Sequence, residues 1–405
     1  MTTNILILGG GYSGVMAALR LAGRTRRTDA VITLINAHDH FVERPRLHEA
    51  ATGVALRQRP LAQMLAGSKV RFVQGRALAI DLAANCVTIE TANGKQHLAY
   101  SYLINALGSR VNRTAIPGVQ EHAFTLDPDG ALTTAALRQR LEALADQPAR
   151  VVVVGGGATG IEAAAQIKHS QPHSQVTLVT QGQVGAFKGP RVQQHLVGAL
   201  VEQQVTLHEH ANVRAVRADG VELEADFLPA DVVIWAGGFV ASPLARVAGL
   251  RVNSLGQTLV DPYLRALSHP HIYAVGDAAC PVEEPGAPMR MSLFTALVSG
   301  AQAAENVAAA IHGKNPQPLS YVWYGQGIAL GPHDAVGFNT FPVDAARGPI
   351  FRRLLAVRIR NFFVWYLSFA LELERRFPGA FYWNGKGRYA RQHRGQATAI
   401  SALKG

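Results

Sequence analysis

A glycine-rich turn between an apolar strand and an alanine-rich helix occurs twice in the chain. The first copy, ILILGGGYSGVMAALRL, covers residues 5–21, and the second, VVVVGGGATGIEAAAQI, covers residues 151–167. Both have the spacing Gly-x-Gly-x-x-Gly, which allows a tight bend, close approach of the backbone to a pyrophosphate, and close helix–strand packing. The free N–H groups at the start of each helix suit phosphate oxygens. The chain is therefore predicted to hold two dinucleotides.

A second apolar strand follows each glycine turn, as a dinucleotide-binding unit requires. The strand AVITLI is followed by Asn36, and the strand QVTLVT ends on Thr180. This position often carries an acid for the ribose hydroxyls of NAD. Asn36 can bind a ribose without charge, whereas Thr180 does not repel the 2′-phosphate of NADP. Lys188 and Arg191 follow closely and could bind that phosphate, so the sequence leaves the choice between NADH and NADPH open.

Three further strands end in small, glycine-bearing loops. They are YLINALGS at residues 102–109, DVVIWAGG at 231–238 and HIYAVGDAA at 271–279. The last is expected to bring Gly276 and Asp277 beside the first glycine turn, where the carboxylate can accept hydrogen bonds from sugar-alcohol hydroxyls. The alternative for Asp277 is a helix N-cap, since aspartate caps helices well. Taken together, these segments favour a ligand-binding role for Asp277.

Composition and charge narrow the class of partner. The 405 residues suffice for two or three domains, and 48% hydrophobic with 17% charged residues is typical of a globular α/β protein. A net charge of +11 suits anionic partners such as nucleotide phosphates or a lipid surface. The arginines form no nucleic-acid motif, so no nucleic acid is expected.

Cysteine and histidine usage argues against several chemistries. Cys86 and Cys280 are the two cysteines, and neither belongs to a Cys-x₂-Cys or Cys-x₄-Cys pair. The dithiol mechanisms of thioredoxin and glutathione reductases, and of sulfide:quinone oxidoreductases, are therefore unsupported. The 15 histidines show no His-Glu-x-x-His pattern, so no metal is predicted. The few cysteines, and a start without a basic leader, favour the cytoplasm.

In this order the segments resemble the two-dinucleotide-binding-domain flavoproteins, which are pyridine nucleotide-disulfide oxidoreductase-like, over residues 3–313. Within that group the chain looks most like type II NADH dehydrogenases and apoptosis-inducing-factor-like reductases. The stretch HDHFVERPRLHEAATG, residues 38–53, matches the type II segment in length and ending but carries Arg44, Arg46, His48 and Glu49. It is more similar to bacterial FAD-dependent oxidoreductases with FVER-x-RLH.

The resemblance implies an α/β fold with two Rossmann-like domains, one inserted in the other. The FAD-binding domain is expected at 1–119 and 251–315, with a hairpin turn at Gly94 in its small antiparallel layer. The NAD(P)H-binding domain is expected at 150–250, and a C-terminal α+β interface or anchor region at 316–405. Bound FAD would be the resident carrier, and NADH or NADPH the visiting donor.

The resemblance also assigns binding residues. For FAD they are Gly9, Gly11, Tyr12, Ser13, Gly14, Asn36, Arg44, Ala77, Ala106, Gly108, Gly276, Asp277, Ser292 and Leu293. For the nicotinamide nucleotide they are Gly155, Gly157, Ala158, Thr159, Gly160, Thr180, Gly237 and Gly238.

Hydride transfer between the two cofactors needs few side chains, because the cofactors perform the chemistry and the protein supplies position and electrostatics. Glu162 is the candidate catalytic residue, since family geometry aims the start of its helix at the flavin. The alternative is a carboxylate favoured by the helix dipole. The helix that begins near Met291 would present N–H groups, with Ser292 and Thr295, to the reduced flavin.

Two features of this helix qualify the prediction. Ser299 is expected to pack rather than bind. Gln302 remains from the quinone-reductase pattern, but the paired glutamines are absent, which weakens the case for a quinone.

The tail after Asn315 has a different character. PLSYVWYGQGIALGPHDAVGFNTF predicts two strands around Gly331 and Pro332, and residues 348–379 predict a basic amphipathic helix. Its longest apolar run, FFVWYLSFAL, has ten residues, fewer than the roughly 20 that cross a bilayer. Such a helix can lie on an anionic membrane, pack on the protein itself, or join a homodimer.

The leading hypothesis is an FAD-dependent NAD(P)H:acceptor oxidoreductase that passes electrons to a quinone at the cytoplasmic membrane face. Two alternatives stay open: a soluble FAD oxidoreductase acting on a small metabolite, and a nucleotide-sensing flavoprotein with incidental turnover.

Overall fold

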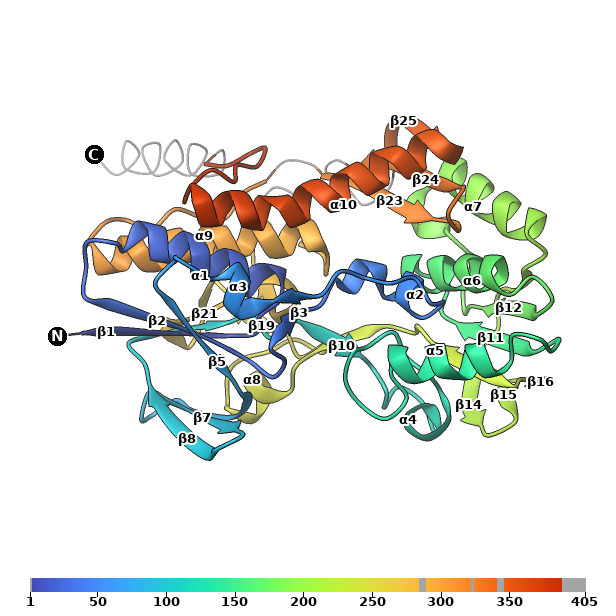
Figure 1. Cartoon of the computed structure of the whole chain (residues 1–405), viewed down its shortest axis with the longest axis horizontal. Helices are drawn as coiled ribbons and strands as arrows, with labels where there is room; N and C mark the ends of the chain where they lie inside the picture. The colour runs from blue at the N-terminus through green and yellow to red at the C-terminus, as the bar shows by residue number, and fades with distance from the viewer. Residues whose placement is uncertain (1, 284–288, 322–323, 341–345, 388–405) are drawn as a thin grey trace, which may run out of the picture.

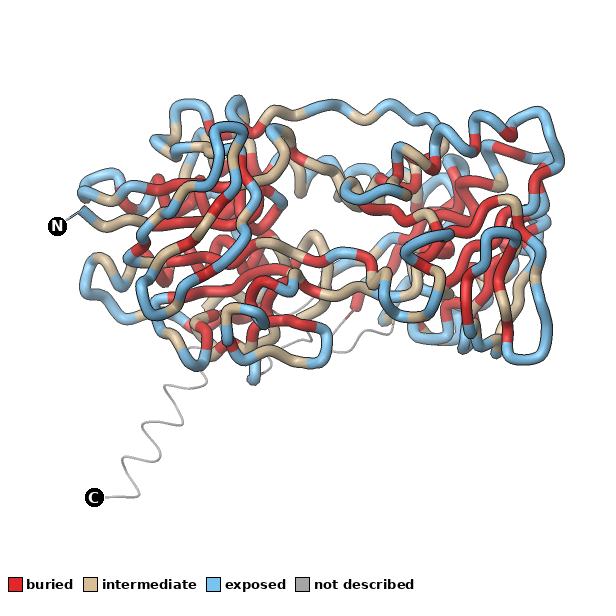
Figure 2. Tube along the Cα trace, turned by 90° about the horizontal axis from the view of Figure 1, so that it is seen from below, coloured by how far each residue is buried: buried red, intermediate tan, exposed pale blue. Residues whose placement is uncertain are grey.

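The computed structural model describes residues 2–283, 289–321, 324–340 and 346–387. Two sheets, one mixed and one parallel, lie side by side along the long axis, each with helices packed against it (Figure 1). Each sheet has its own buried core, and the two cores are seen as separate groups of buried chain in Figure 2. The two Rossmann-like units predicted from the glycine turns are confirmed.

The first sheet has eight strands in the order β22-β19-β20-β21-β9-β1-β2-β5. Its parallel centre consists of apolar strands that are buried, as strands covered on both faces must be. The strands are β1 (Thr3–Leu8), β2 (Ala30–Asn36), β5 (Val70–Gln74), β9 (Tyr102–Asn105), β19 (Thr258–Val260), β20 (Arg265–Ala266), β21 (His269–Ala274) and β22 (Ala279–Pro281). The chain thus returns to its first sheet after building the second.

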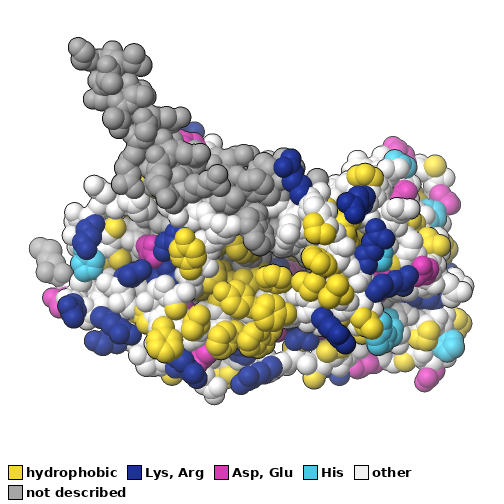
Figure 3. Space-filling model, turned by 90° about the horizontal axis from the view of Figure 1, so that it is seen from above, with side chains coloured by type: hydrophobic (Ala, Val, Ile, Leu, Met, Phe, Trp, Pro, Cys, Tyr) yellow, Lys and Arg dark blue, Asp and Glu magenta, His cyan; other side chains and the backbone are white. Residues whose placement is uncertain are grey.

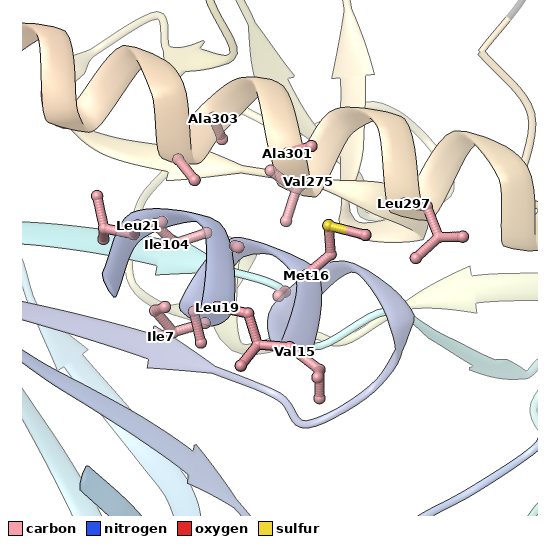
Figure 4. Close-up of a cluster of buried hydrophobic side chains, with 14 of the residues drawn as sticks. Ile7, Val15, Met16, Leu19, Leu21, Ile104, Val275, Leu297, Ala301 and Ala303 are labelled. Atoms are coloured by element: carbon pink, nitrogen blue, oxygen red, sulfur yellow. The ribbon is translucent and has the colours of Figure 1, made fainter. Parts of the chain in front are cut away.

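Two long helices cover one face of the first sheet. Helix α1 (Tyr12–Arg24) and helix α9 (Leu293–Ile311) pack side by side, with Val15, Met16 and Leu297 in the shared core (Figure 4). A Cβ atom at Gly300 would lie 2.3 Å from the carbonyl oxygen of Ser13, so glycine permits this close contact. The α9 N-terminus is thereby fixed next to the first glycine turn.

The second sheet has four parallel strands in the order β13-β12-β11-β17. Its strands are β11 (Arg150–Val154), β12 (Gln175–Val179), β13 (Thr206–His208) and β17 (Val232–Trp235), and its helices are α5 (Thr134–Ala143), α6 (Ala158–Ser170) and α7 (Pro190–Glu202). A two-stranded ribbon, β10 (Ser109–Val111) with β18 (Phe239–Ala241), connects the two halves. The domain boundaries expected from the sequence stay a proposal.

Small antiparallel layers and short helices complete the two halves. Strands β6 (Arg76–Asp81), β7 (Cys86–Thr91) and β8 (Gly94–Ala99) form one layer, and the hairpin at Gly94 is confirmed. The remaining short elements are β3 (His40–Phe41), η1 (Arg44–Arg46), α2 (Leu47–Ala50), β4 (Arg59–Pro60), α3 (Leu61–Met64), α4 (Val119–His122), η2 (Ala186–Lys188), β14 (Val213–Arg217), β15 (Gly220–Leu223), β16 (Phe227–Pro229), α8 (Leu244–Val247) and η3 (Gly276–Ala278).

The C-terminal region forms a three-stranded sheet and a long helix. Strands β23 (Tyr324–Ala329) and β24 (Ala335–Thr340) confirm the two predicted strands, and β25 (Ala346–Arg352) adds a third. Helix α10 (Arg353–Arg376) therefore begins later than the sequence indicated. The β24–β25 ladder extends to Arg352, and Asp334 Oδ1 then accepts a hydrogen bond from the Arg353 N–H at 2.9 Å.

Helix α10 lies across both halves of the molecule, over α1 at one end and over β23–β25 at the other (Figure 1). By length and composition, α10 is the one helix among the described residues that could cross a membrane. The apolar part of this helix is therefore longer than the ten-residue run found in the sequence. One face of this helix nevertheless packs against the rest of the protein, since Ala356, Ala370, Leu371 and Glu374 are buried.

Candidate functional site

The first glycine turn is shaped to hold a pyrophosphate. A Cβ atom at Gly9 would lie 2.3 Å from the Ala106 carbonyl oxygen, and one at Gly14 would lie 1.8 Å from the Gly9 carbonyl oxygen. At Gly11, by contrast, nothing lies within 4 Å, and no side chain caps the start of α1. Two glycines therefore allow close packing, while the third faces space at a helix N-terminus.

The second glycine turn repeats this geometry. A Cβ atom at Gly155 would lie 2.6 Å from the Ala236 carbonyl oxygen, and one at Gly160 would lie 1.9 Å from the Gly155 carbonyl oxygen. Gly157 faces open space, and the start of α6, which includes Ala158 and Thr159, has no side-chain cap. The residues present fit a second dinucleotide.

The two residues at the ends of the second strands touch the glycine turns. Asn36 Oδ1 accepts a hydrogen bond from the Gly10 N–H at 2.8 Å, and its Nδ2 donates to the His38 carbonyl at 2.9 Å. Asn36 thus shapes the turn itself. Thr180 lies equally close to the second turn, because a Cβ atom at Gly156 would lie 2.4 Å from its Oγ1.

Gly276 and Asp277 reach the first glycine turn as expected. Gly276 has a φ of +58°, and a Cβ atom there would lie 3.0 Å from Ser13 Oγ. Ser109 Oγ donates to Asp277 Oδ2 at 2.6 Å. Burial raises the pKa of Asp277, against the opposing effects of Ser109 and the positive charge of Arg44. Asp277 lies within the short helix η3 (Gly276–Ala278), and its role as an FAD ligand stays a prediction.

The other residues predicted to bind FAD stay a prediction, and the structure gives their local contacts. Gly108 has a φ of +66° and is followed by Ser109. Ala77 lies on β6 opposite Ile89. The Tyr12 ring packs edge-on against Phe41, with ring centroids 4.7 Å apart. Arg44 Nη2 also donates to Asp127 Oδ1 at 2.8 Å.

Asp127 is a residue that sequence reasoning missed. It is buried, and its Oδ2 accepts from the Val111 N–H at 2.8 Å while its Oδ1 binds Arg44. It thus ties the η1 segment to the ribbon between the two halves. No local motif marks it, since a loop aspartate acquires this role through tertiary contacts alone.

The start of α9 is capped, and several of its polar residues are structural. Ser292 Oγ accepts from the Thr295 N–H at 3.3 Å, next to Leu293 at the first helical position. Ser299 Oγ accepts from the Gly276 N–H at 2.8 Å, so it positions the Asp277 loop in addition to packing. Gln302 is buried, and its Nε2 donates to the Gln317 carbonyl at 3.1 Å. It therefore holds the segment that follows α9 against the helix.

In the second half, Gly237 and Gly238 follow strand β17 and lie beside the second glycine turn. Gly238 has a φ of +104°, and its carbonyl accepts from the Asn112 N–H at 3.1 Å. Lys188 and Arg191 correct the sequence expectation, because both are directed elsewhere. Lys188 is buried and its Nζ donates to Gln326 Oε1 on β23 at 2.5 Å, while Arg191 donates to the Gly348 carbonyl at 3.5 Å.

Glu162 lies in a compact group that we call the acid–base cluster, formed by His48, Glu49, Glu162 and Arg360. Glu162 Oε1 accepts from the Ala329 N–H at 3.0 Å and from Arg360 Nη2 at 3.3 Å. His48 Nδ1 lies 3.9 Å from Glu162 Oε2, and its Nε2 lies 3.9 Å from Glu49 Oε1. Arg360 was predicted only as part of a basic helix, since its partners are distant in sequence.

Burial and charge set the protonation of this cluster. Burial lowers the pKa of His48, so its neutral form is favoured. Burial works to raise the pKa of Glu49, but hydrogen bonds from Arg46, at 2.7 and 2.9 Å, hold it below its usual value. A neutral imidazole therefore lies between two acidic side chains.

The cluster borders a cavity of about 950 Å³ under α10, which we call the α10 cavity. Its buried lining includes the polar side chains of His48 and Gln166. Its lining on α10 includes two exposed aromatic side chains, Trp365 at 56% and Phe369 at 41% exposure, whose rings are stacked with centroids 5.2 Å apart. Two arginines of the η1 segment differ in their surroundings: the charge of Arg44 lowers the pKa of Asp277 against the effect of burial, whereas Arg46 lines the cavity.

Comparison with known proteins agrees with this geometry. Residues 3–308 match the model of the pyridine nucleotide-disulphide oxidoreductase family. The chain is 28% identical to demethylphylloquinone reductase NdbB of Synechocystis over 82% of this chain and 85% of that protein. It is 30% identical to the NADH dehydrogenase-like protein Rv1812c of Mycobacterium tuberculosis over 82% and 87%.

The fold also matches the crystal structure of sulfide:quinone oxidoreductase from Aquifex aeolicus, with a TM-score of 0.77 and 21% identity over 93% of this chain and 92% of that one. The chain belongs to the pyridine nucleotide-disulphide oxidoreductase family. It is an FAD-dependent oxidoreductase of pyridine nucleotides, which confirms the class expected from the two glycine turns.

Proposed function

We propose that the protein is an NADH:quinone oxidoreductase that works at a membrane surface. The observation that carries this proposal is the α10 cavity, whose lining includes the buried polar side chains of His48 and Gln166 and the exposed aromatic side chains of Trp365 and Phe369. The similarity to a demethylphylloquinone reductase and to an NADH dehydrogenase-like protein supports the donor and the acceptor.

We assign FAD to the first glycine turn and NADH to the second, with the binding residues expected from the sequence. When bound, FAD accepts hydride from the nicotinamide and passes electrons on. The chain supplies phosphate binding at the starts of α1 and α6 and a carboxylate at Asp277. Ser109 and Ser299 fix the Asp277 loop in position.

The α10 cavity fits the two chemical parts of a quinone. The carbonyl oxygens of the ring need hydrogen-bond donors, and Gln166, His48 and Arg360 line the cavity. The apolar tail needs a path to lipid, and Val364, Trp365 and Phe369 line the side formed by α10. A quinone held this way has its ring towards the cluster and its tail towards the surface.

Reduction of a quinone by NADH also consumes one proton from solvent: NADH, H⁺ and quinone give NAD⁺ and quinol. The acid–base cluster can deliver that proton, because His48 can accept at one ring nitrogen and donate from the other. Glu49 and Glu162 lie 3.9 Å from those two nitrogens. We therefore propose that His48 carries the proton.

The outer face of α10 is the proposed membrane contact. Figure 3 shows apolar side chains gathered over this helix with basic residues around them. The most exposed apolar side chains of α10 are Leu354, Leu355, Phe362, Phe363 and Trp365, and Phe377 follows the helix. Because the opposite face is packed on the protein, we propose that the helix lies along the cytoplasmic membrane face instead of crossing it.

A blocked cavity tests the proposal. Val364 lines the cavity, whereas Leu355 is 56% exposed and does not line it. Val364→Trp should raise the KM for a short-chain ubiquinone at least tenfold in NADH turnover, and Leu355→Trp should leave it unchanged. Ferricyanide, which needs no such pocket, should be reduced equally by both variants. Unchanged quinone kinetics in Val364→Trp, or no quinone reduction by the parent protein, would overturn the proposal.

A further inference from the structure

The nucleotide site lacks an acid at its usual place. Thr180 follows β12, where a carboxylate commonly binds the ribose hydroxyls and repels a 2′-phosphate. The Thr180 side chain is held against Gly156, where a Cβ atom would lie 2.4 Å from its Oγ1. On these residues alone the site would accept NADH and NADPH alike.

The loop after β12 is joined to the loop after β13 by three backbone hydrogen bonds. The Thr180 N–H donates to the His208 carbonyl at 2.9 Å, and the Ala211 N–H donates to the Thr180 carbonyl at 3.0 Å. The His210 N–H donates to the Gly182 carbonyl at 3.1 Å. The residue between His208 and His210 is therefore fixed beside the ribose end of the site.

That residue is Glu209, and its carboxylate points into the same loop. Glu209 Oε1 accepts a hydrogen bond from the Val184 N–H at 2.7 Å. Parallel strands lie about 4.8 Å apart, so an acid after β13 begins about one strand spacing from the place where an acid after β12 would begin. The chain thus carries a negative charge at this edge, contributed by the neighbouring strand.

The first two basic residues that follow β12 in the chain do not offset this charge. Lys188 Nζ donates to Gln326 on the C-terminal sheet, and Arg191 donates to the Gly348 carbonyl. Both side chains are thus directed to the C-terminal region, away from the loop that Glu209 holds.

We propose that Glu209 is the specificity-determining residue that makes the protein prefer NADH over NADPH. Its carboxylate repels the 2′-phosphate, which carries up to two negative charges, and leaves unphosphorylated ribose unaffected. Charges within a Debye length of about 8 Å interact appreciably at physiological ionic strength. The inference rests on the second glycine turn binding a pyridine nucleotide and is independent of the acceptor.

Binding of redox-inactive fragments tests the inference without turnover. Isothermal titration of the FAD-loaded protein with ADP-ribose and with 2′-phospho-ADP-ribose, at pH 8 and low salt, measures discrimination directly. The parent protein should bind ADP-ribose at least tenfold more tightly. Because repulsion between charges is screened by salt, that ratio should fall severalfold in 0.5 M NaCl.

Two substitutions separate charge from loop structure. Glu209→Gln keeps an oxygen for the Val184 N–H and removes the charge, whereas Glu209→Ala removes both. Both should lower the ratio to about two, mainly by tighter binding of the phosphorylated fragment. Glu224→Gln removes an exposed acid of the same half, whose side chain is 58% exposed, and should leave the ratio unchanged.

Three results would overturn the inference. They are a parent ratio near one, an unchanged ratio in Glu209→Gln, and a change confined to Glu209→Ala, which would show that the loop and not the charge discriminates. Failure of quinone reduction would not affect these measurements, so the two proposals can fail separately.

Discussion

At the scale of single residues, His48 is the side chain to which we assign the most specific chemical role. It is 5% exposed, lines the α10 cavity and lies between Glu49 and Glu162. Replacing it with glutamine keeps a polar side chain but removes the ability to accept and release a proton. We expect His48→Gln to slow reoxidation of the reduced protein by a quinone about a hundredfold, a typical contribution of general acid catalysis.

A comparison of two electron acceptors distinguishes a proton-transfer role of His48 from a structural role. Ferricyanide takes electrons without protons, so its reduction by the His48→Gln variant should match the parent. The solvent isotope effect on quinone reduction should rise as proton transfer becomes limiting. His40→Gln, which changes a partly exposed histidine on β3 outside the cavity lining, serves as the control. Equal losses with both acceptors would show that His48 only supports the fold.

Lys188 gives a pH dependence of stability. Burial, with a smaller contribution from the charge of Arg290, lowers the pKa of Lys188 to about 7 from the ordinary 10.5. Between these values the unfolded chain binds a proton that the folded protein does not, so stability rises with pH. This group adds at most about 1.4 kcal/mol per pH unit.

The test compares the free energy of unfolding at pH 7.5 with that at pH 9. Urea unfolding followed by flavin fluorescence should show a larger gain in unfolding free energy for the parent than for Lys188→Met. Lys168→Met serves as the control, since its amine donates to the nearby carbonyls of Pro172 and Ser174. The same pH slope in parent and Lys188→Met would contradict the assigned pKa.

Which site residues the sequence could predict follows from how local their signals are. Gly9, Gly11 and Gly14 are recognisable because the turn demands them within six positions of one strand and helix. Arg360 and Asp127 acquire their roles from partners far along the chain, so no spacing marks them. Lys188 and Arg191 were considered for the 2′-phosphate because they are near Thr180 in sequence. Their side chains contact the C-terminal region in the structure, and nearness in sequence could not predict those contacts.

At the scale of elements, α10 is fixed to α1 by a buried ion pair. Arg20 is fully buried and donates through Nη2 to Glu374 Oε2 at 2.8 Å and to the Phe381 carbonyl at 2.7 Å. Glu374 also accepts from the N–H groups of Gly379 and Phe381. One carboxylate thus holds the helix end and the following turn on the helix that begins at the first glycine turn.

Removing Glu374 should be costly, because the buried Arg20 guanidinium loses the carboxylate that accepts from its Nε and Nη2 and keeps Glu305 as its remaining ion-pair partner among the described residues. We expect Glu374→Leu to lower the free energy of unfolding by roughly 3–5 kcal/mol, measured by urea unfolding. Arg20→Met with Glu374→Leu should recover part of that loss, since both charges are then gone. The matched surface change, Glu142→Leu, breaks an exposed pair with Arg138 and should cost at most about 1 kcal/mol. A small effect of Glu374→Leu would contradict the anchoring role.

The outer face of α10 predicts lipid binding. Phe362→Ser with Trp365→Ser removes two side chains that are 55% and 56% exposed, so the folded protein should be little affected. Co-sedimentation with vesicles containing anionic lipid should fall at least tenfold, because membrane affinity scales with buried apolar area. Unchanged sedimentation, or loss of a dimer in place of lipid binding, would assign this face to a second copy of the chain.

Sequence patterns predicted the elements unevenly. Strands β1 and β11 are continuous apolar runs, which is what burial on both faces requires, and were predicted directly. Most of strand β25 (Ala346–Arg352) falls within the range that the sequence predicts as helix, because the strand pairs with β24 through tertiary contact and carries no alternating pattern of burial. Local pattern therefore places the central sheets better than the C-terminal region.

At the scale of the whole molecule, the two glycine turns belong to two sheets joined by the β10–β18 ribbon and bridged by α10. Arg360 on α10 contacts Glu162 of the second half and Glu49 of the first. Arg360 therefore links the α2 segment of the first half to α6 of the second beside the α10 cavity. This arrangement suits a resident carrier that alternates between a nucleotide and an acceptor.

The most direct test is anaerobic stopped-flow spectroscopy of the purified, FAD-loaded protein. NADH should bleach the flavin absorbance within milliseconds to seconds, and a short-chain quinone mixed with the bleached protein should restore the colour at a rate that rises with quinone concentration. Flavin that stays oxidised in NADH, or reduced protein that a quinone reoxidises no faster than buffer does, would contradict the account.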